Sequence, residues 1–71
     1  MVTIRATYTE RSGHVFSQIL TYDDSRKAMI EFENMRNILR AGWREGDYRS
    51  GLITLMAGDY RLMEFSVGIE D

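Results

Sequence analysis

The sequence of 71 residues contains no cysteine and no proline, and its only histidine is His14. The lack of cysteine rules out disulfides, and a zinc site built from Cys and His is excluded for the same reason. A chain of this length buries only about 60% of the surface that it exposes when unfolded. Small domains usually compensate with disulfides, metals or a partner subunit. We therefore expect close packing of helix on sheet, or a second subunit.

Long apolar runs are also missing. No stretch approaches the roughly 18 to 20 residues that span a bilayer, and the segment 1–5 lacks the regions of a signal peptide. Neither a P-loop nor a dinucleotide-binding glycine pattern occurs, so no cofactor is predicted. We expect a complete cytoplasmic chain that forms a single domain over residues 1–71, without membrane association.

The charge is close to balanced, with 9 Lys and Arg against 11 Asp and Glu and a net charge of −2. A weakly acidic chain is a poor match for general binding to a phosphate backbone. Eight of the 9 cationic residues are Arg, with Lys27 the exception. Because Arg makes planar, bidentate contacts that Lys does not, local recognition by Arg stays open.

The first part of the chain predicts a β-hairpin. Apolar residues alternate with polar ones over 2–9, and a second β-rich run follows over 14–22 after the turn residues 10–13. The first strand should direct Val2, Ile4, Ala6 and Tyr8 to one face. In the second strand we place the larger Phe16, Leu20 and Tyr22 inward, and Val15, Ser17, Ile19 and Thr21 outward.

One amphipathic helix is predicted to follow. Asp23, Asp24 and Ser25 supply capping oxygens and negative charge for its start. Its apolar stripe consists of Ala28, Phe32, Met35 and Leu39, with Met29 and Ile38 at the flanks. Gly42 is a natural left-handed terminator, and Trp43 could then pack on Ile38. The predicted helix therefore runs from near Ser25 to near Ala41.

The tetrapeptide Gly-Asp-Tyr-Arg begins at Gly46 and again at Gly58, 12 residues later. That interval fits one strand and its connection, so we interpret both copies as turns that begin or end strands rather than as a duplicated binding element. A loop over 58–60 places Phe65 opposite Ile53 and Met63 opposite Leu55, which gathers the apolar residues on one face. We expect the inward set to be Ile53, Leu55, Met63, Phe65, Val67 and Ile69.

These elements predict an α+β fold of ββαββ order, with a four-stranded, mainly antiparallel sheet and one helix on one face. The strand order stays open: the second and third strands could be parallel neighbours, or the first strand could lie beside the fourth.

A single helix covers one face of such a sheet, so the other face should be polar in a lone monomer. Instead, five aliphatic residues are predicted on the uncovered face. A misassigned strand face or a strongly twisted sheet would explain them, but we favour an interface, because contiguous apolar patches mark interaction surfaces. We predict that this face contacts a second copy in a homodimer or a partner protein, through Val15, Ile19, Leu52, Met56 and Leu62.

No catalytic residues and no metal site can be assigned. Nucleophilic catalysis requires a base beside the nucleophile, and His14 directly after a turn is better explained as a surface residue. Asp23 and Asp24 are better explained as helix caps than as a metal pair.

Arginine and aromatic residues cluster around the predicted end of the helix. Cations there complement the helix dipole, which gives them a structural explanation. The same residues could also bind an acidic protein surface or single-stranded nucleic acid. The candidate partner-binding set is Arg36, Arg40, Trp43, Arg44, Tyr48 and Arg49.

We therefore expect a small non-enzymatic protein that inhibits a larger protein or ribonucleoprotein partner by occupying its surface. In size and mild acidity the chain resembles the anti-defence inhibitors of phages and mobile elements, including anti-CRISPR proteins, which act in the host cytoplasm; this likeness is one of scale and not of motif. The alternative is a small nucleic-acid-binding module that uses the Arg and aromatic patch. A small enzyme would require active-site residues that the sequence does not offer.

Overall fold

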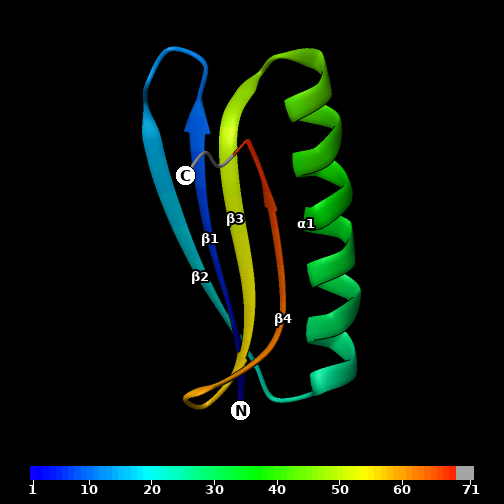
Figure 1. Cartoon of the computed structure of the whole chain (residues 1–71). Helices are drawn as coiled ribbons and strands as arrows, with labels where there is room; N and C mark the ends of the chain where they lie inside the picture. Colours follow the sequence, from blue (N-terminus) through cyan, green and yellow to red (C-terminus); the bar gives the residue numbers. More distant parts are fainter. Residues whose placement is uncertain (69–71) are drawn as a thin grey trace.

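The computed structural model describes residues 1–68 and confirms the ββαββ order in an α+β fold. The elements are β1 (Val2–Glu10), β2 (Val15–Tyr22), α1 (Ser25–Glu45), β3 (Tyr48–Ala57) and β4 (Tyr60–Val67). All four strands form one antiparallel sheet, and α1 lies along one side of it, chiefly against β3 (Figure 1). Ile69, which was predicted to face inward, lies outside the described residues. Within residues 1–68 no helix has both the length and the apolar character that a membrane crossing requires.

The strand order is β2-β1-β3-β4. It differs from both orders left open by the sequence, because β1 lies between β2 and β3 and pairs with each of them. The connection through α1 therefore passes over β1 before the chain re-enters the sheet as β3. As a result β2 and β4 are the two edge strands, one at each end of the strand order (Figure 1).

The helix begins as predicted and ends later. The Asp24 carboxylate accepts a hydrogen bond from the Arg26 backbone N–H at 2.8 Å, which caps the start. At the other end Gly46, with φ 87°, adopts the left-handed conformation, and the Asp47 N–H donates to the Gly42 carbonyl at 2.8 Å. This is a Schellman closure one turn beyond the predicted one. The prediction that Gly42 ends the helix is wrong.

Gly42 is instead a buried helical residue. The Tyr48 ring lies so close that a Cβ on Gly42 would come within 2.5 Å of two ring carbons. A glycine is therefore needed here because of close packing and not because of an unusual backbone angle.

The core lies between α1 and the facing side of the sheet. The predicted helix stripe is buried, as are the predicted inward residues of β1 and the centre of β3. Flanking residues are more open, because one helix is narrower than four strands: Met29, Ile38 and Met63 remain partly exposed. The buried apolar cluster is Val2, Ile4, Ala6, Tyr8, Ala28, Phe32, Met35, Leu39, Ile53 and Leu55.

The β3–β4 hairpin has the predicted register but reaches it differently. Ile53 pairs with Phe65 and Leu55 with Met63, as expected. However, Ala57 pairs with Tyr60, so the loop contains two residues instead of the three predicted. A register shift next to Met56 adds one residue to β4 and thereby restores the predicted pairing. The second Gly-Asp-Tyr-Arg copy thus forms this turn, while the first follows α1 at the other end of β3. Both copies are turns that lead into strands, as predicted.

Candidate protein-binding face

The side of the sheet opposite α1, here called the open face, carries the side chains predicted to point outward. The register places Thr7 of β1 beside Ser17 of β2 and Leu52 of β3, and places Arg5 beside Ile19 and Thr54. The same alternation continues along β1, β2 and β3. In β4 a register shift next to Met56 leaves Leu62 without a partner and places Arg61 opposite Met56. The residues of the open face are Thr3, Arg5, Thr7, Thr9, Val15, Ser17, Ile19, Thr21, Ser50, Leu52, Thr54, Met56, Arg61, Leu62, Glu64 and Ser66.

All five predicted aliphatic residues lie on the open face and none is buried. Val15 is 55% exposed, Ile19 65% and Leu62 46%, while Leu52 and Met56 are half-buried. They form two groups, one on the edge strand β2 and one on β3 and β4. No part of the described chain covers them, so the face is available to another molecule.

The column between the two apolar groups is polar and comes from β1. It contains three threonines and Arg5, which is exposed and has no salt-bridge partner within the described residues. The Thr7 and Ser17 hydroxyls lie 3.3 Å apart, so this part of the face contains its own hydrogen bond. On the far edge Arg61 and Glu64 form an ion pair at 2.7 Å. Arg5 is therefore the free cation of the open face, and an acidic group on a partner would complement it.

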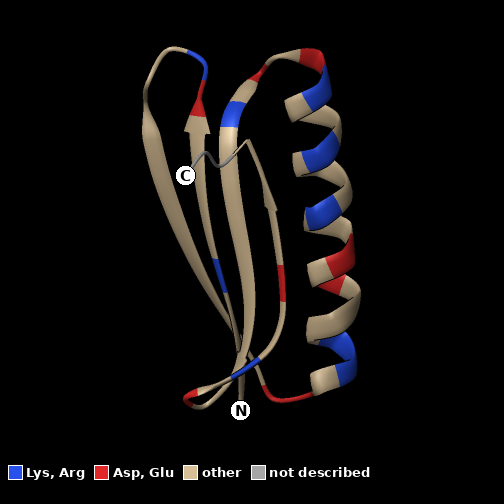
Figure 2. Ribbon diagram, in the orientation of Figure 1, with Lys and Arg blue, Asp and Glu red and all other residues tan. Residues whose placement is uncertain are grey.

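The predicted arginine cluster is split by the structure. Arg36 pairs with Glu33 at 2.9 Å on the flank of α1 that borders β4, and the Arg40 guanidinium lies 5.5 Å from the centre of the Phe65 ring. These contacts secure the helix to itself and to β4. Arg36, Arg40 and Arg44 lie in the C-terminal half of α1, where Arg44 in the last turn complements the helix dipole. Arg26 lies in the first turn, and Figure 2 accordingly shows cationic residues at both ends of the helix.

The remaining members of that set lie apart from one another. Trp43 and Arg49 line an open hollow of about 480 Å³ together with Ser50 and Gly68. Tyr48 is half-buried, and its ring stacks on Tyr8 at 5.5 Å between centroids, so it belongs to the core. Arg44 is exposed in the last turn of α1. The structure therefore brings together Trp43 and Arg49, and it places Tyr48 in a different environment.

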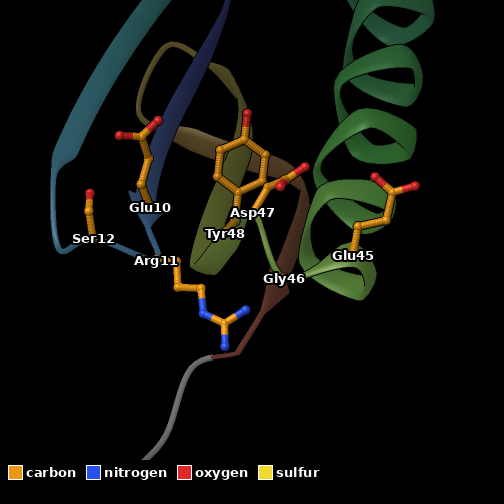
Figure 3. A pocket seen from close by; sticks show the side chains of 7 residues that line it. All are labelled: Glu10, Arg11, Ser12, Glu45, Gly46, Asp47 and Tyr48. Atoms are coloured by element: carbon orange, nitrogen blue, oxygen red, sulfur yellow. The ribbon is translucent and has the colours of Figure 1, made fainter.

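A second hollow, of about 630 Å³, opens where the β1–β2 turn meets the end of α1 (Figure 3). Glu10, Glu45 and Asp47 border it, and the Arg11 side chain lies against Gly46, beside the helix C-terminus. The Arg11 backbone N–H also donates to the Asp47 carbonyl at 3.1 Å. Within residues 1–68 no three Asp, Glu, His or Cys side chains converge to hold a metal ion. We interpret this hollow as the junction that holds the hairpin against the helix end.

Two tyrosines on the helix side of the sheet have perturbed acidity. Burial raises the pKa of Tyr8, and the nearby Tyr48 and Glu31 raise it further. Desolvation is the larger cause of the raised pKa of Tyr22, and the nearby Glu31 raises it further. Both shifts keep the phenols neutral, which suits packing residues and gives no nucleophile or base.

Sequence reasoning underestimated how exposed β2 is. Phe16, Leu20 and Tyr22 were predicted to be inward, and they do point to the helix side, but Phe16 is exposed and Leu20 and Tyr22 are only half-buried. The reason is that α1 lies chiefly against β3, two strands away. The sequence does not signal this exposure, because no charged residue occurs between His14 and Tyr22, which is typical of a buried strand.

Comparison of the chain with protein-family models, with curated proteins and with solved structures gives no match. The function is therefore argued from the surface of the molecule.

Proposed function

We propose that this chain is a non-enzymatic protein-binding protein that acts by covering a surface of a larger partner with the open face. The observation that carries the proposal is the exposure of Val15, Ile19 and Leu62 beside half-buried Leu52 and Met56 on a sheet side that no element covers. Exposed apolar groups on an uncovered sheet face, here divided by the threonines and Arg5 of β1, support an interaction surface.

The shape of the molecule favours occlusion over catalysis. Neither described hollow includes any of the five aliphatic residues, and the perturbed groups are neutral tyrosines that pack in or beside the core. A broad sheet face with a central cation suits a partner surface that offers apolar groups around a carboxylate. The biological role that we propose is that of an anti-defence inhibitor encoded by a mobile element, a class that the chain resembles in size and mild acidity.

The proposal is tested by comparing three tagged proteins in affinity purification from the organism that supplies the sequence. The wild type should retain a discrete partner, and Leu52→Lys should lose it. Loss of a hot-spot residue near the centre of an interface costs about 2 kcal/mol or more, which is at least a tenfold loss of affinity. Asn37→Lys, a charge added at an exposed helix position, should retain the partner.

The same proteins separate this function from the alternative. A nucleic-acid-binding module using Arg36, Arg40, Arg44 and Trp43 would bind single-stranded oligonucleotides at low salt and release them steeply as salt rises. We expect no such binding. Retention of the same partner by Leu52→Lys would contradict the proposed role of the open face, and salt-sensitive oligonucleotide binding would favour the alternative.

A further inference from the structure

The two edge strands of the sheet differ in how they are protected. Natural edge strands carry charge, proline or a bulge that prevents pairing with another chain. β4 has such protection, with the Arg61–Glu64 ion pair at 2.7 Å and a register shift opposite Met56. β2 has none: Figure 2 shows this strand without a charged residue, and its pairing with β1 is regular over Val15–Tyr22.

Apolar side chains occupy both faces of β2. Val15 and Ile19 are exposed on the open face, while Phe16 is exposed and Leu20 half-buried on the helix side. A further strand beside β2 would give these apolar side chains cross-strand contacts on both faces. In the single chain β2 is an edge, so its sequence fits an assembly with a further strand beside it.

The hydrogen-bond phase of the first hairpin shows which backbone groups are free. The Glu10 N–H donates to the His14 carbonyl at 2.8 Å, which makes residues 10 and 14 a hydrogen-bonded pair. Because such pairs alternate along an antiparallel ladder, the even-numbered residues of β2 bond to β1. The N–H and C=O groups of Val15, Ser17, Ile19 and Thr21 therefore point away from the sheet.

We infer that β2 pairs with β2 of a second copy of this chain, antiparallel and with the two-fold axis at Gln18, so that the two four-stranded sheets join into one. In this register Ser17 pairs with Ile19 of the second copy, and Val15 with Thr21. All the outward backbone groups are then satisfied, and Phe16 lies opposite Leu20 of the second copy. A register centred on Ile19 would place Val15 opposite Asp23, which lies beyond the strand.

A second copy explains both edges at once. An uncharged strand meets its own copy without repulsion between like charges. The resulting dimer exposes only its two β4 edges, which are protected, so the assembly closes at two chains and does not extend into a fibre. The two open faces become continuous and stay uncovered. This inference does not rest on the proposed function, since it concerns the edge and not the face.

Opposite charges introduced at the two-fold axis by substitution of Gln18 test the inference. Gln18 is exposed and lies opposite its own copy at a non-hydrogen-bonded pair, where side chains are closest. Light scattering should give a wild-type mass of about 17 kDa, twice the 8.3 kDa of one chain. Gln18→Lys and Gln18→Glu should each weaken the dimer at least tenfold, and an equimolar mixture should restore it. Asn37→Lys, at an exposed position on the helix, should dimerise like the wild type.

Two results would overturn the inference: a wild-type monomer at all concentrations up to roughly 1 mM, where even weak association is detected, or a dimer unaffected by either Gln18 variant. Should both variants fail to fold, hydrogen exchange on the wild type decides the question. The amides of Ser17 and Ile19 should be protected at high protein concentration and exposed on dilution. Rapid exchange of these amides at every concentration would refute the pairing.

Discussion

Replacement of Gly42 by alanine tests whether Tyr48 is a packing residue, as the structure indicates, or a free binding residue, as the sequence suggested. In an open helix position this change gains about 1 kcal/mol from helix propensity. Here the new Cβ would approach the Tyr48 ring carbons to 2.5 Å, so the ring must move. Overpacking costs about 1–3 kcal/mol, and weaker stacking of Tyr48 on Tyr8 adds about 0.5–1.5 kcal/mol. The net expectation is a loss of about 0.5–3.5 kcal/mol.

Urea unfolding followed by circular dichroism measures this loss. With a slope of about 1 kcal/mol per M for a small domain, the midpoint should fall by about 0.5 M or more. In a Tyr48→Ala background the same Gly42→Ala change should instead stabilise the helix by about 1 kcal/mol, because the obstructing ring is gone. Ala41→Gly, at an exposed position of α1, serves as the propensity control and should cost about 1 kcal/mol. A higher midpoint for Gly42→Ala with Tyr48 present would refute the packing role.

Two further predictions concern the two sides of the sheet. Leu55→Ala, at a position 1% exposed on the helix side, should lower the free energy of unfolding by about 2–5 kcal/mol, whereas Leu62→Ala on the open face should cost less than about 1 kcal/mol; equal losses in urea unfolding would show that the faces are misassigned. Tyr8→Phe should reduce alkaline destabilisation: the folded-state pKa of Tyr8 is raised above its usual value of 10.0, so its contribution is complete below about pH 10 and is lost as pH rises through the folded pKa. The free energy of unfolding, measured between about pH 8 and 11, should therefore fall less steeply for Tyr8→Phe than for the wild type. Identical pH profiles for variant and wild type would contradict the burial of this phenol.

Local patterns in the sequence predict most of the fold. Alternation identifies the inward residues of β1, and the spacing of Ala28, Phe32, Met35 and Leu39 identifies the buried stripe of α1. These signals are strong because each depends on neighbouring residues of one element. The register of the second hairpin was also predicted, because only the pairing of Ile53 with Phe65 gathers the apolar residues on one face.

Features that depend on contacts between distant segments could not be predicted. The end of α1 was misplaced because Gly42 has the sequence character of a terminator, while its reason for being glycine is the Tyr48 ring six residues later. The strand order depends on the choice of neighbours for β1, which no local pattern records. The arginine set looked like one cluster in sequence, but the turn at Gly46 sends Tyr48 into the core.

The sequence predicted which residues form the candidate site but did not predict how they are arranged. The five aliphatic side chains were placed on the correct side of the sheet, yet their division into two groups by the β1 threonines and Arg5 follows from the strand order alone. The exposure of β2 on both faces likewise depends on the position of α1 over β3. The structure thus shows two separate surfaces: the open face, which the sequence predicted as an interface, and the β2 edge, which only the strand order identifies.

Site-specific photo-crosslinking tests the central claim, that the open face binds a partner protein, most directly. A photoreactive residue at Thr54, in the middle of the face beside Arg5, is compared with one at exposed Asn37 on α1 in cells of the source organism. The account predicts a discrete crosslinked partner from position 54, lost when Leu52→Lys is added, and none from position 37. A partner captured from position 37 and not from position 54 would contradict it.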